Sequence, residues 1–228
     1  MHPLDNIIWL ALTTRQAHMA EGREAARRFV PEISVLSAIH APNEDGWSAL
    51  ARLSRPGDVS AIFLVEPYVP RPGWTTVRTA PLLEMIHDGR RPADAPGNHR
   101  PTILELGDAD VPEMMALTQL TKPGPFSPRT RQMGTYLGFR INGNLAAMAG
   151  ERLHVPGYTE ISAVCTHPDF AGRGYARILM TEIMQRIYDR GETPFLHVRQ
   201  GNSRAVGIYQ AMGFRERVLL HLAVIRKD

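Results

Sequence analysis

The residues at 172–176, Gly-Arg-Gly-Tyr-Ala, have the types and the position to bind a phosphate group. Residues 160–166 are rich in β-branched and small apolar types, which indicates a strand, and an amphipathic helical run begins at Tyr175. No Ser, Thr, Asp or Asn directly precedes Tyr175, so we expect the first N–H groups of this helix to lack a side-chain cap. Gly172 and Gly174 have no Cβ that would keep a ligand from the backbone. Free N–H groups at the positive end of a helix dipole suit a phosphate or pyrophosphate, while the alternative is an ordinary glycine turn.

Two common phosphate-binding loops do not fit this segment. A Walker loop needs Gly-Lys-Ser/Thr, and the two lysines of the chain, Lys122 and Lys227, do not stand in such a sequence. A dinucleotide-binding fingerprint needs glycine or alanine at position 177, where this chain has Arg177.

The pattern that remains resembles the acyl-CoA pyrophosphate loop of the GCN5-related N-acetyltransferase (GNAT) superfamily, written Gln/Arg-x-x-Gly-x-Gly/Ala, and in particular its FR47-like branch. Gly174 and Ala176 fill the last two defined positions, while Ala171 stands where the family has Gln or Arg. This departure removes one side-chain contact and leaves the backbone cradle. The resemblance implies acetyl-CoA as co-substrate and a cofactor loop made of Ala171, Gly172, Arg173, Gly174, Tyr175 and Ala176. No metal is expected, because the chain has one cysteine and its histidines at 18, 40 and 87 lack metal-ligand spacing.

A second family motif, Asn-x-x-Ala-x-x-x-Tyr-x-x-x-Gly-Phe, is matched by Asn202, Ala205, Tyr209, Gly213 and Phe214. The resemblance implies that Tyr209 points at the coenzyme sulfur. A phenol with a pKa of about 10 can protonate a leaving thiolate of parent pKa about 8.5. The alternative is a core tyrosine in an apolar stripe. Asn202 is expected both to cap the helix that follows and to contact the pantetheine arm.

The strand at 158–166 carries further candidates. Glu160 could deprotonate an amine acceptor, which is largely protonated at neutral pH, or could be a solvent-facing charge near a strand end. Strand alternation places it on the same side as Ser162 and Val164. The resemblance implies that the backbone at Val164, Cys165 and Thr166 pairs with pantetheine and that an amide there polarises the thioester carbonyl. Cys165 is disfavoured as a covalent nucleophile because no histidine and carboxylate are evident around it.

Composition limits the other function classes. A net charge of +3 with dispersed basic residues argues against nucleic acid as a partner, and the single cysteine, Cys165, argues against an internal disulfide. The chain has no apolar run long enough to span a bilayer, and residues 1–12 lack the basic start of a signal peptide. We therefore expect a cytoplasmic protein without a membrane partner. Its acceptor is expected to be a small-molecule or peptide amine.

The chain is expected to form a smaller N-terminal α/β unit at 1–87, a polar linker at 88–101 and an acetyltransferase domain at 102–228. In the first unit the patterns predict helices at 14–29 and 46–53, strands at 60–66 and 74–78, and a helical turn at 80–87. In the domain they predict strands at 102–106, 134–141, 144–152, 158–166, 194–199 and 214–226, with helices at 108–120, 175–190 and 203–212. The fold class is α/β (α+β), the GNAT fold, with a mixed, mostly antiparallel sheet flanked by helices.

The function predicted from these motifs is direct transfer of an acetyl group from acetyl-CoA to a primary amine. In the superfamily that the chain resembles, the region at 121–128 usually shapes the acceptor pocket, so Lys122 and Phe126 are candidate substrate-facing residues. The alternative, which we favour, is that they only close a loop. A non-catalytic acyl-CoA-binding or sensing module is the alternative, and Ala171 is the feature that allows it. Residues 1–87 could also be a degenerate second copy of the same fold, used for packing or as the interface of a homodimer.

Overall fold

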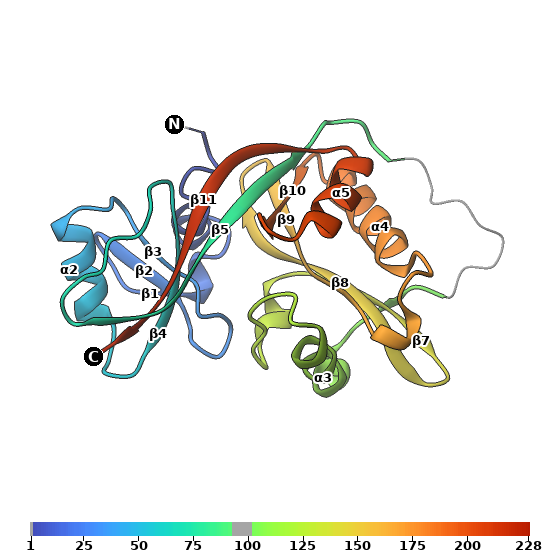
Figure 1. Cartoon of the computed structure of the whole chain (residues 1–228), viewed down its shortest axis with the longest axis horizontal. Coiled ribbons are helices and arrows are strands. Elements are labelled where there is room, and N and C mark those ends of the chain that lie inside the picture. The colour runs from blue at the N-terminus through green and yellow to red at the C-terminus, as the bar shows by residue number, and fades with distance from the viewer. Residues whose placement is uncertain (1, 93–101) are drawn as a thin grey trace.

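One eight-stranded sheet, built from both halves of the chain, is the frame of the protein (Figure 1). The structure is a computed structural model that describes residues 2–92 and 102–228. In sheet order the strands are β4 (Val59–Leu64), β11 (Phe214–Lys227), β5 (Trp74–His87), β10 (Thr193–Arg199), β9 (Tyr158–Thr166), β8 (Asn144–Val155), β7 (Tyr136–Ile141) and β6 (Leu104–Glu105). β9 and β10 run parallel and the other neighbouring strands run antiparallel. The expected fold class, a mixed and mostly antiparallel sheet, is therefore confirmed.

The remaining elements surround this sheet. The α-helices are α1 (Ile7–Thr13), α2 (Glu44–Leu53), α3 (Val111–Thr121), α4 (Tyr175–Asp189) and α5 (Ser203–Ala211). A small second sheet contains β1 (Ala20–Glu21), β2 (Ala26–Phe29) and β3 (Ser37–Ile39). Four short 3-10 helices are η1 (Ala17–Met19), η2 (Asp108–Asp110), η3 (Thr130–Met133) and η4 (Pro168–Phe170).

Helices α3 and α4 cover opposite faces of the sheet at β8. The apolar stripe of α4 packs with Ala147 and Ala149, whereas Met114 and Leu117 of α3 pack with Met148. Side chains of successive strand residues point to opposite faces, so neighbours on β8 that contact different helices place those helices on different sides. The sheet is thereby buried on both faces where β8 and β9 pass between the helices.

The first 87 residues contribute strands to the same sheet as the rest of the chain. β5 lies between β11 and β10 and pairs with β11 along its whole length, and β4 forms the edge beyond β11. The expected linker at 88–101 lies for the most part outside the described residues. The division into units at 1–87 and 102–228 stays a prediction, but these units share one sheet.

Two expectations for the first unit are wrong. No α-helix forms over 14–29, because the chain folds its α-helix earlier, as α1, and then makes the short 3-10 helix η1 and the strands β1 and β2. The helical turn expected at 80–87 belongs to the long strand β5. Leu82 packs in the cluster around α1 while Leu83 and Met85 pack in the cluster around α4. A strand buried on both faces has a continuous apolar run, which periodicity does not distinguish from a short buried helix.

The hairpin between β7 and β8 has the predicted turn. Asn142 and Gly143 both have positive φ, 51° and 83°, as a two-residue type I′ turn requires. Other predicted elements are confirmed within a few residues, including α2, α4, α5 and the parallel pairing of β10 with β9. In the described residues no helix has the length and apolar character needed to cross a membrane.

Replacing Gly150 should destabilise the sheet, because β8 passes directly over an aromatic ring there. A Cβ built on Gly150 would lie 2.2 Å from the ring of Tyr136, its partner on β7. We expect Gly150→Ala to lower the free energy of unfolding by about 1–3 kcal/mol, measured by urea denaturation. The control is Gly207→Ala in α5, where a Cβ has open space, and a gain of about 0.5–1 kcal/mol is expected. Equal stability of the Gly150 variant and the wild type would contradict the close approach.

Candidate active site

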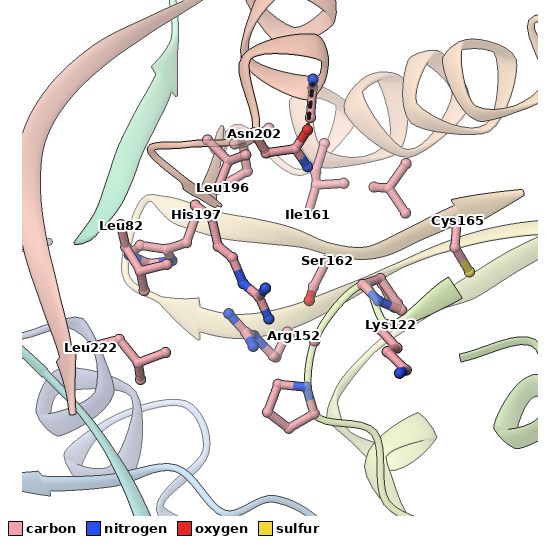
Figure 2. Close-up of a pocket in the computed structure, with 18 of the residues that line it drawn as sticks. Leu82, Lys122, Arg152, Ile161, Ser162, Cys165, Leu196, His197, Asn202 and Leu222 are labelled. Carbon is pink, nitrogen blue, oxygen red and sulfur yellow. Dashed lines mark hydrogen bonds between the residues drawn. The ribbon is translucent and has the colours of Figure 1, made fainter. Parts of the chain in front are cut away.

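The parallel strands β9 and β10 pair at one end and then part. Their register joins Tyr158–Glu160 to Thr193–Phe195 and goes no further. Beyond Phe195, β10 pairs only with β5, and beyond Glu160, β9 pairs only with β8. The edge of β9 over 161–166 is therefore free, and a cavity of about 400 Å³ opens between the two strands. Figure 2 shows the side chains that surround this opening.

A bulge in β9 alters which residues face the cavity. Met148 is opposite Cys165 and Gly150 is opposite Ser162, so two residues of β9 lie opposite one of β8. Ala163 in this bulge has a φ of 52°, a left-handed backbone that is uncommon for a residue with a Cβ. The bulge interrupts the alternation, and Val164 packs toward the cluster around α4 while Cys165 packs toward α3. The expectation that Val164 shares a face with Glu160 is wrong for this reason.

A second bulge, in β8, brings Arg152 against Glu160. Glu151 is opposite Ile161 and His154 is opposite Thr159, which leaves Arg152 and its neighbour facing the single residue Glu160. Nε and Nη2 of Arg152 donate to the Glu160 carboxylate at 2.8 and 2.5 Å. This ion pair lies at the point where β9 and β10 part.

Glu160 is the centre of a buried chain of charges. Its side chain is 1% exposed, and its Oε1 lies 2.7 Å from Nδ1 of His197. On the other side of His197, Nε2 lies 3.3 Å from Glu84, which is paired with Arg217. Burial by itself raises the pKa of Glu160, but Arg152 and His197 outweigh it and lower the pKa to about 2.

The same contacts favour the protonated form of His197. Burial by itself lowers its pKa, but the carboxylates of Glu160 and Glu84 outweigh that effect and raise the pKa above its ordinary value. Arg152 and His197 line the cavity, whereas Glu160 lies behind them and is not among the lining residues. The carboxylate therefore fixes two cations in the wall and does not itself face the open space.

The charged groups that line the cavity are all cationic. They are Arg78, Lys122, Arg152, His197 and Arg199. Among the described lining residues there is no aspartate or glutamate. The apolar part of the wall comes partly from the first half of the chain, through Leu36, Ala61, Phe63 and Leu82.

Tyr209 and Cys165 both line the cavity, from α5 and β9. Burial raises the pKa of Tyr209 to about 12, with a smaller contribution from Cys165. Burial also raises the pKa of the Cys165 thiol to about 11. At neutral pH both groups are protonated, so Tyr209 can donate a proton and Cys165 is a poor nucleophile.

The oxygen and the nitrogen of the Asn202 side-chain amide have different roles. Its Oδ1 accepts a hydrogen bond from the Ala205 N–H at 3.3 Å and so caps α5 (Figure 2). Its Nδ2 has no partner among the described residues, and the side chain lines the cavity. The nitrogen is thus available to a ligand while the oxygen holds the helix.

The start of α4 has the geometry of an anion cradle. Gly172 and Gly174 have φ values of 79° and 77°, and a Cβ built on either would meet no atom within 4 Å. No side chain caps the helix. The backbone N–H groups at 172–177 make no hydrogen bond to any described residue. Ala171 is exposed at the entrance of this loop.

The predicted site residues thus fall into three groups. Val164, Cys165, Thr166, Asn202 and Tyr209 line the cavity, the loop at 171–176 forms the uncapped helix start, and Glu160 lies behind the wall. Lys122 also lines the cavity, while Phe126 packs against Tyr136 in an adjoining recess.

The sequence did not point to Arg152, His197 or Arg78. The available signal was an ionisable residue inside an apolar strand, because such residues are rarely buried without a partner. Arg152 and His197 both meet this description, in β8 and β10.

Comparison with known proteins identifies the same part of the chain. The family model described as FR47-like protein matches residues 136–221. A GNAT-family protein of known structure from Novosphingobium aromaticivorans is 38% identical, with a TM-score of 0.91 and 100% of both chains covered. A GCN5-related N-acetyltransferase from Kribbella flavida shares the fold, with a TM-score of 0.64 at 17% identity over 96% of both chains.

Among curated proteins, the alanine N-acetyltransferase of ribosomal protein bS18 from Escherichia coli strain K12 is 29% identical over 124 residues. The match covers 52% of this chain and 83% of that relative. The FR47-like match includes strands β9 and β10 and helices α4 and α5, and the Novosphingobium protein aligns over its full length. From these matches we conclude that this chain is an acyltransferase that belongs to the GNAT superfamily, in its FR47-like branch.

Proposed function

We propose that this protein transfers an acetyl group from acetyl-CoA directly to a primary amine. The observation that carries the proposal is the placement of a protonated phenol, Tyr209, in the cavity that opens beside the free edge of β9. Curated relatives include an alanine N-acetyltransferase of ribosomal protein bS18 and an N-alpha-acetyltransferase, which supports an amine acceptor. Acetyl-CoA supplies an activated thioester, and the residues of this chain position it and move protons.

The start of α4 is where the pyrophosphate would bind. The free N–H groups at 172–177 and the left-handed glycines Gly172 and Gly174 leave room for an anion against the backbone. Arg173 and Tyr175 belong to the same loop. Because residue 171 is alanine, backbone N–H groups rather than a side chain at this position would bind the pyrophosphate.

The free edge of β9 would hold the pantetheine arm as an added strand. Val164, Cys165 and Thr166 present backbone groups on the side where β10 has turned away. Nδ2 of Asn202 is a further donor from the opposite wall. An N–H group of this edge, aimed at the thioester carbonyl, would stabilise the oxyanion that forms when the amine attacks.

The transfer step needs one proton to leave nitrogen and one to reach sulfur. The neutral amine attacks the carbonyl carbon, the new C–N bond forms, and the C–S bond breaks as the carbonyl reforms. Tyr209 donates its proton to the departing sulfur and recovers one from the nitrogen, directly or through water. Products are the N-acetyl amine and free CoA, with no net proton gained by the protein.

In this proposal Glu160 is a positioning residue and not the base. A carboxylate with a pKa of about 2, bound to two cations and shielded from the cavity, is a weak acceptor of an amine proton. Its contacts hold Arg152 and His197 in the wall. The amine would instead lose its first proton to water before it attacks.

A non-catalytic module that binds acyl-CoA is the second candidate, supported by Ala171 in the phosphate loop. One measurement, thiol release from acetyl-CoA, distinguishes the transferase from the non-catalytic module. A transferase releases thiol from acetyl-CoA in the presence of an amine, whereas a sensing module binds CoA and releases none.

Tyr209→Phe should remove the proton donor and leave the binding surface. We expect kcat for thiol release, measured at saturating acetyl-CoA, to fall about 10²- to 10⁴-fold while the Kd for CoA changes little. Tyr68→Phe is the matched control, because that hydroxyl lies outside the cavity and has no partner. An unchanged kcat in the Tyr209 variant would sink the assignment of the acid.

The pH profile should be set by the acceptor amine. With no carboxylate lining the cavity, we expect kcat/KM for the amine to rise about tenfold per pH unit until the amine's own pKa is reached. Tyr209 has a pKa of about 12, so it stays protonated and the rate should not fall between pH 8 and 10. Steady-state rates across this range test the point. A descending limb below pH 10 would show that the acid has an ordinary pKa.

Glu160→Gln should act mainly on stability. Removing the carboxylate leaves Arg152 and His197 buried without their partner, and we expect a loss of about 3–5 kcal/mol in the free energy of unfolding. Glu66→Gln, at an exposed side chain outside the ion pairs, should change stability by less than about 0.5 kcal/mol. If Glu160→Gln keeps full stability and loses kcat alone, Glu160 is the base after all.

A further inference from the structure

The cavity offers hydrogen-bond donors and positive charge without a protein acceptor to match them. Arg78, Lys122 and Arg199 line it and make no ion pair with any described residue. Arg152 and His197 are paired, but their carboxylate partners lie behind the wall. The open space is therefore electropositive and favours a bound molecule that carries negative charge.

Arg152 presents a fixed donor to this space. Glu160 takes Nε and Nη2, and Nη1 has no partner in the described part of the chain. The side chain is 11% exposed and lines the cavity. Because the ion pair and the bulge of β8 hold the guanidinium in place, little rotamer entropy is lost when Nη1 binds a ligand.

A hydroxyl group adjoins Arg152. Ser162 lines the same cavity, and its hydroxyl makes no hydrogen bond to a described residue. This hydroxyl is therefore available to a ligand oxygen beside the guanidinium. Figure 2 shows Arg152, Ser162 and Lys122 around the same opening.

Their position separates these donors from the proposed thioester site. Arg152 binds Glu160, where β9 and β10 still pair, whereas Cys165 lies further along β9, beyond the point where the strands part. The cradle at the start of α4 is a different segment again. The donors around Arg152 thus belong to the acceptor's end of the cavity.

The geometry points to an acceptor amine that carries a carboxylate, held by Arg152 with the hydroxyl of Ser162. This inference rests on the proposed function and specifies its substrate class. A carboxylate is an acceptor-only group, and its oxygens match a guanidinium nitrogen beside a hydroxyl donor. The carboxylate can be that of a free amino acid or that of an acidic side chain in a peptide.

The test compares acceptors that differ only in this charge. Alanine and phenylalanine are each paired with their amides, and the peptide Ala-Glu-amide is paired with Ala-Gln-amide. Thiol release is measured at saturating acetyl-CoA, and we expect kcat/KM to favour the carboxylate member of at least one pair by about tenfold or more. A preference within the amino acid pairs indicates a free α-carboxylate, and one within the peptide pair indicates an acidic side chain. Similar or higher rates for all the amides would overturn the inference and leave the transferase standing.

The variant Arg152→Lys tests whether Arg152 is the residue that causes the preference for a carboxylate acceptor. Lysine keeps a positive charge for Glu160 but loses the fork, so we expect KM for the carboxylate acceptor to rise about tenfold, with kcat and the rates of the amides little changed. Arg226→Lys, at an exposed residue outside the cavity and without an ion pair, is the matched control. Loss of kcat for all acceptors alike would show that Arg152 is merely structural.

A binding measurement keeps the inference testable without turnover. N-acetylalanine, N-acetylphenylalanine and N-acetyl-Ala-Glu-amide, with their uncharged counterparts, are titrated calorimetrically into the wild type and Arg152→Lys in the presence of CoA. Tighter binding of a carboxylate form to the wild type, lost in the variant, supports the inference even if no amine is acetylated. If the uncharged forms bind as well as the carboxylates, or if no carboxylate form binds, the inference is wrong.

Discussion

The buried carboxylate of Glu160 sits where the two central strands of the sheet part. It joins Arg152 from β8 to His197 from β10, and Glu84 of β5 and Arg217 of β11 extend the same chain of charges. Charged side chains from five neighbouring strands therefore meet in one buried cluster. A buried charge must be paired, so each of these strands has to keep its register for the others to be stable. Below this point β9 and β10 pair, and beyond it they separate into the cleft.

The cleft combines two irregularities that regular strands would not provide. The bulge at Ala163 turns Val164 away from the face of Glu160 and Cys165 toward α3, and the bulge at Arg152 places a guanidinium in the wall. One end of β9 is thus surrounded by basic groups and the Ser162 hydroxyl, and the other lies near a protonated phenol. A site with donors at one end and an acid at the other is suited to hold a charged acceptor and to release a thiolate.

The first 87 residues complete this site as well as the sheet. β5 pairs with β10 over the stretch where β10 has left β9, so it supports the far wall of the cleft. Ala61 and Phe63 of β4 and Leu82 of β5 form part of the lining. Residues of the first half of the chain thus supply one wall of the cavity. Specificity for the acceptor can therefore arise from both halves.

The sequence alone determined the local features. A strand followed by an uncapped, glycine-rich helix start, the Asn-Gly hairpin and the Asn202 cap depend on neighbouring residues, and each was read from the chain. The helix expected over 14–29 was wrong because β1 and β2 pair within that segment, and the turn expected over 80–87 was wrong because β5 pairs with the distant strand β11. Only the tertiary structure showed that Glu160 is enclosed by Arg152 and His197. Charge pairing across three strands depends on bulges and register, and no spacing along one strand encodes them.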